Sequence, residues 1–253
     1  MKVNEIMGIF LINVGVNASH GGLKSPLFED GSFEFIPIPE AKKGIHSYPD
    51  CPLLPRYIDL KSPNQRDLLN FIPKKYWMLR VHNDPEFDTF TYGDYPTLSP
   101  RAANLKRANI GDFLFFFARL ELWKDGKFTG KAGFYLIGFF EIERILKNVT
   151  KRPTHSQLEV FGNNAHIKRG LSDPKYWDGF WVFKGSKKSK LFKRAVPITR
   201  EFINTVLTNS NKGNLIFPPN RTELQVIGSY TRAARVIENG KEPLFWEFIN
   251  KAC

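Results

Sequence analysis

The fold is decided by two apolar segments in the middle of the chain, Phe113-Leu-Phe-Phe-Phe-Ala-Arg-Leu120 and Gly133-Phe-Tyr-Leu-Ile-Gly-Phe-Phe-Glu-Ile142. Both are rich in aromatic and branched residues, which favour β-strands, and both are too short to cross a bilayer. Between them lies Asp125-Gly126, a dipeptide typical of a tight hairpin turn. We therefore predict two buried strands at the centre of the fold.

The composition predicts a folded globular protein. Hydrophobic residues make up 42% and aromatic residues 14% of the 253 residues, enough to bury a substantial core. Neither a low-complexity linker nor an internal repeat divides the chain, so we predict a single elaborated α+β domain over residues 1–253. The two cysteines, Cys51 and Cys253, lack the spacing of a metal-binding pair, and we expect no disulfide between them.

Turn and capping residues place the remaining elements. Residues 41–75 carry many turn residues, so we expect little regular structure there. Ser99-Pro100 suits the start of a helix that ends near Gly111, and Thr199 suits the N-cap of a helix that reaches Leu207. The other expected elements are strands at 9–16, 32–39, 77–82 and 179–183 and helices within 221–237 and 243–251.

The apolar segment near the N-terminus could be mistaken for a targeting signal. It runs from Ile9 to Val16, is interrupted by Asn13 and is shorter than a good targeting core, so we interpret it as a strand. We accordingly expect a cytoplasmic protein without a membrane partner. The chain shows no signature of a nicotinamide, flavin or methyl-donor cofactor, and we predict none.

The charge of the chain indicates a polyanionic partner. The formal net charge is +12, and Lys and Arg side chains release counterions when they bind a phosphate backbone. Residues 184–194 hold six basic side chains and no acidic one, although a solvated face that binds nothing is the alternative. We predict a nucleic acid or nucleotide partner, with phosphates bound by Lys24, Arg101, Lys106, Arg107, Lys168, Arg169, Lys184, Lys187 and Lys188.

The central part of the chain resembles the centre of a PUA-like domain, through Gly111-Asp-x-Leu-Phe-Phe-x-Ala-Arg119 and Tyr135-Leu-Ile-Gly-x-Phe-Glu-Ile142. That superfamily includes the EVE, ASCH and YTH domains, small β-barrels that hold modified or flipped-out nucleobases. The resemblance implies a PUA-like β-barrel core at about residues 76–200, with flanking helices and an N-terminal extension.

Other segments resemble a family called nucleotide modification associated domain 3. The resemblance rests on residues 14–40 and on three short motifs, Thr91-Tyr-Gly-Asp-Tyr95, Asn164-Ala-His166 and Ile227-Gly-Ser-Tyr-Thr-Arg232. It extends over most of the chain. It implies a setting in DNA or nucleotide modification and leaves open whether the protein recognises a base or catalyses a reaction.

The loop 17–26 and the motif 91–95 are the expected walls of a base pocket. Two adjacent glycines in the loop permit close backbone approach, although an ordinary glycine turn is the alternative. The Asp94 carboxylate can accept a hydrogen bond from the exocyclic amine of a base. Tyr92 and Trp177 are expected to stack on a base, with core packing as the alternative. The predicted base-binding residues are Asn17, Ser19, His20, Tyr92, Asp94, Asn164, His166 and Trp177.

Three side chains are the candidate catalytic groups if the protein is an enzyme, namely Lys24, Asp94 and His166. The five histidines lack the short spacing of a ligand pair, so we predict no metal. A zinc site joining His20, His82 and His166, or an oxygen-ligand site in the acidic loop 84–95, is the alternative.

We therefore expect recognition of a nucleobase, in particular a modified one, in DNA or RNA. A hydrolase or transferase that acts on a nucleotide or nucleobase is the alternative, and a structural interaction protein is a third possibility.

Overall fold

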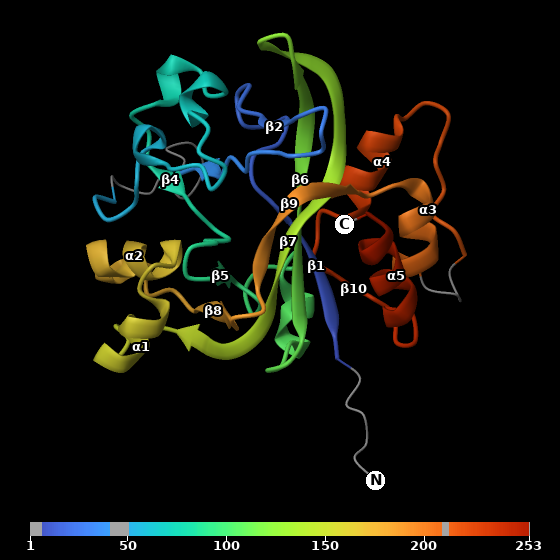
Figure 1. The fold of residues 1–253 in the computed structure, drawn as a ribbon. Helices are drawn as coiled ribbons and strands as arrows, with labels where there is room; N and C mark the ends of the chain where they lie inside the picture. Colours follow the sequence, from blue (N-terminus) through green and yellow to red (C-terminus); the bar gives the residue numbers. More distant parts are fainter. Residues whose placement is uncertain (1–6, 41–50, 209–212, 253) are drawn as a thin grey trace.

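The computed structural model describes residues 7–40, 51–208 and 213–252 of the chain. One large mixed sheet lies between two groups of helices (Figure 1), which confirms the α+β class. The sheet runs in the order β10 (Arg235–Val236), β1 (Ile9–Val14), β6 (Phe113–Lys124), β7 (Lys127–Val149), β8 (Phe180–Gly185) and β5 (Thr91–Asp94); β2 (Ser25–Leu27) also pairs with β6, and β9 (Lys190–Pro197) with β7.

The central hairpin is the one that the sequence predicts. β6 and β7 are antiparallel, and Lys124 pairs with Lys127 across a turn formed by Asp125 and Gly126. Both turn residues have positive φ, 51° and 74°, as a two-residue hairpin turn of the primed type requires. Most aromatic side chains of the two strands are buried in the core, and Phe115, for example, has no exposed surface. β1 lies parallel to β6 on its other side.

Strand β7 belongs to both parts of the sheet. Its first half pairs with β6 and β9, and its second half pairs with β8. The partner changes from β6 to β8 between Glu141 and Ile142, and register shifts interrupt the pairing with β8 after Ile142 and after Leu146. Figure 1 shows the strand bending as it passes from one part to the other.

The two groups of helices cover different parts of the sheet (Figure 1). The helices α3 (Arg200–Phe202), α4 (Glu223–Tyr230) and α5 (Glu242–Ala252), with a π-helical turn at Ile203–Leu207, lie on one side. There the ring of Phe245 packs edge-on against Phe115, with 4.6 Å between the centroids. On the other side, α1 (His155–Phe161) and α2 (Ala165–Ser172) pack on β8 through a separate apolar cluster that includes Ile167 and Phe180.

The main sheet is open in the described residues. Its path ends at β10 on one edge and at β5 on the other, and these two strands do not pair with each other there. The sheet is thus not closed into a barrel, and the PUA-like barrel stays a prediction.

A small unit with little regular structure covers the sheet near β2. It holds the two-stranded sheet β3 (Ile38–Pro39) and β4 (Val81–His82), as well as its own apolar cluster around Tyr57. We predicted little regular structure in residues 41–75. Residues 41–50 lie outside the described residues, and the prediction holds for residues 51–75. The 3-10 helices of the structure are Tyr57–Asp59, Leu68–Asn70, Lys74–Tyr76, Ala103–Arg107 and Pro174–Tyr176.

Three predicted elements are wrong in kind or length. The segment that begins at Ser99-Pro100 forms only the 3-10 helix 103–107, and the Arg101 carbonyl accepts a hydrogen bond from the Ala234 N–H rather than from its own segment. The strands predicted over 32–39 and 77–82 form only over the last two residues of each range, 38–39 and 81–82. The N-cap prediction is confirmed, since the Thr199 side chain accepts a hydrogen bond from the Phe202 N–H.

Buried Cys51 is a free thiol, and Cys253 lies outside the described residues. Across the described ranges, no helix combines the length and the apolar character that crossing a membrane requires.

Candidate functional site

A pocket of about 860 Å³ lies where distant parts of the chain meet. One wall is the end of β1 with the loop that follows it, and the opposite wall is β5 with the N-terminal part of α2. The helix α4 supplies a third wall through Leu224 and Gln225, and Arg232 lies just after the end of this helix. The lining therefore draws on residues from Asn13 to Arg232, and pockets of this size commonly hold small ligands.

The pocket collects most of the predicted base-binding residues. Those that line it are Asn17, Ser19, His20, Tyr92, Asp94 and His166, together with the predicted phosphate ligands Arg101 and Arg169. Asn164 is fully buried behind this lining, where it caps α2 by accepting a hydrogen bond from the His166 N–H.

The loop after β1 is held in shape by its own side chains. The Asn17 carboxamide oxygen accepts hydrogen bonds from the Ser19 N–H at 2.9 Å and from the Ser19 hydroxyl at 2.7 Å. His20 Nδ1 accepts from the Asn17 N–H at 3.0 Å, which fixes the ring proton on Nε2 when the imidazole is neutral. Partial burial lowers the pKa of His20.

The Asp94 carboxylate is fixed by two donors in its own strand motif. The Tyr92 hydroxyl donates to Oδ2 at 2.6 Å, and the Tyr95 N–H donates to Oδ1 at 2.7 Å. Burial raises the pKa of Asp94, partly offset by these contacts and by the charge of Arg101. Tyr92 was expected in a polar loop, but it lies buried in β5, with its ring packed against Phe116 and Phe183.

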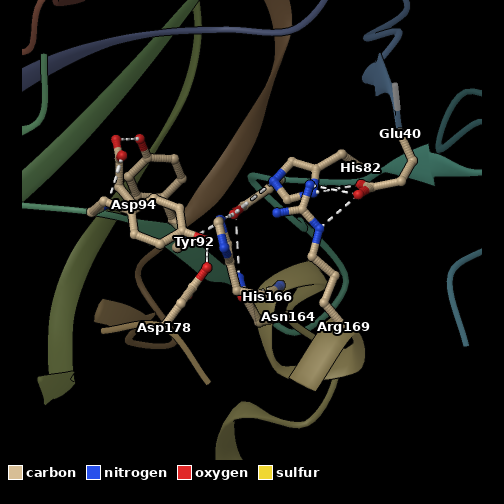
Figure 2. A network of polar contacts seen from close by, with 11 residues as sticks. Glu40, His82, Tyr92, Asp94, Asn164, His166, Arg169 and Asp178 are labelled. Carbon is tan, nitrogen blue, oxygen red and sulfur yellow. Dashed lines mark hydrogen bonds and ion pairs between the residues drawn. The ribbon is translucent and has the colours of Figure 1, made fainter. Parts of the chain in front are cut away.

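Below Asp94, a buried polar cluster forms the floor of the pocket (Figure 2). Its centre is Asp84, whose Oδ2 lies 3.4 Å from His166 Nε2 and 3.8 Å from His82 Nε2. The Gly93 N–H donates to both oxygens of Asp84, at 3.0 and 2.9 Å, and Asn164 donates to Oδ1 at 3.4 Å. The two imidazole rings lie edge to face, 4.8 Å apart.

A buried ion pair supports the cluster from behind. Arg169, from α2, contacts Oε1 of Glu40 through Nε at 2.7 Å and through Nη2 at 2.6 Å. The other oxygen, Oε2, lies 3.2 Å from His82 Nδ1, although the two atoms are not aligned for a hydrogen bond. Burial raises the pKa of Glu40, but the contacts with His82 and Arg169 outweigh it and leave that pKa lowered.

Burial dominates the protonation of the cluster. It raises the pKa of Asp84 well above its ordinary value and lowers the pKa of His166 well below its own, with the charge of Arg169 adding to the effect on His166. The pKa of His82 is also lowered, first by burial and then by Arg169. Both imidazoles are therefore neutral at pH 7 and have a lone pair available for a proton or a metal ion.

Several predicted site residues lie elsewhere. Lys24 forms an ion pair with Glu121 at 2.7 Å beside β2 and β6, because β2 joins that edge of the sheet. The structure thus brings Asp94 and His166 into one pocket but leaves Lys24 out. The Trp177 ring packs on Gly170 of α2, so closely that a Cβ on Gly170 would lie 2.2 Å from the nearest atom of the ring.

The remaining predicted phosphate ligands also lie outside the pocket. Lys184 donates to the Thr89 carbonyl at 2.6 Å, and Lys188 pairs with Glu141 at 2.8 Å. Lys184 and Lys187 line a second cavity of about 600 Å³ between β8 and α1. Lys106 and Arg107 are exposed on the 3-10 helix 103–107, and Lys168 is half-buried on α2.

Sequence reasoning missed the centre of the cluster. Spacings between histidines do not reveal the pair of His82 and Asp84. A tight turn brings these two residues together, with a hydrogen bond from the Asp84 N–H to the His82 carbonyl. The alternation His-x-Asp at the end of a strand was the available signal. Glu40 gave no signal of its own, because its partner Arg169 lies far away along the chain.

Comparison with known proteins gives one match. The family model described as nucleotide modification associated domain 3 matches residues 8–232, a range that includes every residue of the pocket lining. No curated protein and no solved structure matches the chain. The chain therefore belongs to the nucleotide modification associated domain 3 family, and its role is in a nucleotide modification system.

Proposed function

We propose that the pocket binds a nucleotide unit and recognises its base. The observation that carries this proposal is the meeting of several arginines and the fixed carboxylate of Asp94 in a single pocket of sufficient volume. Arginine suits phosphate, because its planar group donates parallel hydrogen bonds to two oxygens. A carboxylate that is held in position by its own hydrogen-bond donors can accept a further hydrogen bond from the exocyclic amine of a base.

The arginines divide into two kinds. Arg169 is bound to Glu40, and Arg119 lies 3.6 Å from Glu121, so both are already occupied. Arg101 and Arg232 are exposed at the pocket, and within the described residues neither guanidinium has an ion-pair partner. These two are the proposed phosphate ligands.

The base is proposed to lie deeper, against Asp94. Asn13 and His20 also line the pocket and supply further donors and acceptors. A base that belongs to a polynucleotide reaches such a pocket only after it leaves the stack, which is easiest for a mismatched, damaged or single-stranded base. The net charge of +12 favours a base within DNA or RNA over a free nucleotide. The form that we propose is recognition of a modified base, as in PUA-like domains.

A second function is favoured by the buried cluster. Asp84 and His166 have pKa values shifted in opposite directions and face the same pocket. Groups of this kind concentrate at catalytic sites, where a neutral imidazole takes up a proton and a protonated carboxyl group gives one up. A hydrolase or transferase that acts on the bound nucleotide is therefore the second candidate.

A double variant at the rim tests the proposed binding. Arg101→Ala with Arg232→Ala should weaken binding of labelled DNA and RNA oligonucleotides by about tenfold or more, since each contact between a charged donor and a phosphate contributes about 1.5–3 kcal/mol. The control is Lys127→Ala with Lys151→Ala, which removes the same charge from exposed positions outside the pocket. Fluorescence anisotropy on unmodified and modified bases provides the measurement. Equal losses in the two double variants would show that the pocket is not the binding site.

A further inference from the structure

The floor of the pocket has the ligand geometry of a metal centre. His82, Asp84 and His166 each offer one atom, and these atoms all lie within 4.8 Å of one another. We propose that they bind one divalent first-row transition-metal ion through His82 Nε2, Asp84 Oδ2 and His166 Nε2. Two ligands about 2.0–2.1 Å from a tetrahedral ion lie about 3.4 Å apart. The distance from Asp84 Oδ2 to His166 Nε2, 3.4 Å, already matches that value, and the distance of 3.8 Å to His82 Nε2 needs only a small contraction.

The groups behind the three ligands are those that a metal site needs. A histidine that binds a metal usually presents its second nitrogen to a carboxylate, which orients the ring and makes it a stronger ligand. Glu40 Oε2 lies 3.2 Å from His82 Nδ1, and Arg169 holds that carboxylate in place. Asp84 is oriented in the same way by the Gly93 N–H and the Asn164 side chain.

Buried polar atoms without a hydrogen-bond partner concentrate in the same cluster. In the described residues, five buried side-chain nitrogen or oxygen atoms have no hydrogen-bond partner, and three of them are Glu40 Oε2, His82 Nδ1 and His166 Nδ1. Folded proteins rarely leave such atoms unpaired, and a concentration of them in one cluster points to an ion or to chemistry at that place. A cation on His82 Nε2 would strengthen the interaction between the Nδ1 proton and Glu40.

The donor set indicates the class of metal. Two imidazole nitrogens and one carboxylate oxygen suit zinc, iron, cobalt or manganese, whereas magnesium and calcium prefer oxygen ligands alone. All three residues line the pocket, so the remaining coordination positions face the space proposed for the nucleotide. Three protein ligands with an open position are typical of catalytic rather than structural sites.

Metal uptake tests the site without any nucleotide, so its result is distinguishable from a failure of the proposed binding. The full chain, with any affinity tag removed, is stripped with EDTA and then titrated separately with Zn²⁺, Co²⁺, Mg²⁺ and Ca²⁺. We expect one Zn²⁺ or Co²⁺ per chain by mass spectrometry of bound metal, with a visible absorption band for Co²⁺. We expect no stoichiometric uptake of Mg²⁺ or Ca²⁺.

Matched variants assign the ligands. Asp84→Asn and His166→Gln should each weaken Zn²⁺ binding by about tenfold or more, as even the loss of a supporting group does in known sites. His155→Gln removes an exposed histidine of α1 that does not line the pocket, and this variant should bind Zn²⁺ as the parent does. Unchanged affinity in the two folded cluster variants would overturn the proposal, and so would a parent chain that binds Zn²⁺ and Co²⁺ only substoichiometrically.

If the cluster variants do not fold, X-ray absorption spectroscopy of the Zn²⁺-loaded parent identifies the ligand atoms of the metal. The proposal requires two imidazole ligands with oxygen in the first shell. A shell with sulfur, or without imidazole, would place the ion elsewhere and overturn the assignment.

Discussion

Gly93 of β5 and His166 of α2 are in such close contact that a Cβ on Gly93 would lie 2.4 Å from Cδ2 of the imidazole. The same Cβ would lie 2.9 Å from the Asn164 side-chain oxygen, which caps the helix. The strand and the helix can approach this closely only because residue 93 has no side chain. The glycine of the Thr-Tyr-Gly-Asp-Tyr motif therefore determines where His166 stands in the pocket.

Gly93→Ala should consequently destabilise the protein and displace His166. Insertion of a methyl group into a well-packed contact costs about 1–3 kcal/mol. Urea denaturation of parent and variant measures this loss, and an unchanged midpoint would show that α2 moves away from β5 freely. The same variant should also lose the Zn²⁺ affinity proposed above, because the imidazole no longer faces Asp84.

The central hairpin gives a prediction about stability. Phe115 is fully buried and stacks on Phe139 at 5.1 Å, so Phe115→Ala should cost about 3–5 kcal/mol. Ile110→Ala is the control, because that side chain is 70% exposed and should change the free energy of unfolding little. If chemical denaturation gives equal values for the two variants, β6 is not the centre of the core.

Asp94→Asn separates recognition from catalysis. The substitution keeps the shape but removes the charge that an exocyclic amine would meet. If the protein recognises a base, the variant should change which base is preferred, by about 1–3 kcal/mol. If Asp94 instead serves as an acid or base, binding should persist while turnover falls by roughly 10²–10⁴.

Both quantities can be measured on one panel of modified and unmodified nucleotides, free and within oligonucleotides. Asp88→Asn is the matched control, since that exposed carboxylate lies outside the pocket. A variant of Asp94 that matches the parent in both assays would remove this residue from the site.

The buried histidine predicts a pH dependence of stability in the metal-free protein. Burial lowers the pKa of His166 in the folded state, so the unfolded state binds more protons below about pH 6.5. His166 therefore withdraws stability as the pH falls from 7 to 5. Asp84 acts in the opposite direction, because its raised pKa lets the folded state take up a proton first.

A comparison of the parent with a variant that lacks His166 separates the effect of His166 on stability from the opposing effect of Asp84. The difference in free energy of unfolding between the parent and His166→Gln, measured with EDTA present, should shrink as the pH falls, by at most about 1.4 kcal/mol per pH unit. A difference that stays constant from pH 7 to 5 would mean that His166 titrates as it does in the unfolded chain.

Local patterns predicted the parts of the structure that depend on neighbours in sequence. The hairpin at Asp125-Gly126 and the cap at Thr199 need only a few adjacent residues, and both are confirmed. Asp94 and His166 were also singled out from short motifs, and both line the pocket. The role proposed for each remains a prediction.

The features that could not be predicted from the sequence depend on contacts between residues far apart in the chain. Lys24 was predicted to bind phosphate because it follows the two glycines of its loop. The pairing of β2 with β6 instead places the Lys24 side chain against Glu121. The cluster joins Glu40 to Arg169 and Asp84 to Asn164, pairs that are separated by 129 and 80 residues. No local pattern encodes such separations, since they follow from how the sheet and α2 come together.

The shared strand β7 has a consequence for ligand size. The pocket has α4 on the side of the sheet that β6 and β9 build, and β5 with α2 on the side that β8 builds. β7 pairs with both parts and bends between them, so its curvature sets how far apart the opposing walls stand. Relatives with a different irregularity near Ile142 would therefore admit ligands of a different breadth while keeping every contacting side chain. Selectivity in this architecture can change through the backbone of β7, from which only Phe134 lines the pocket.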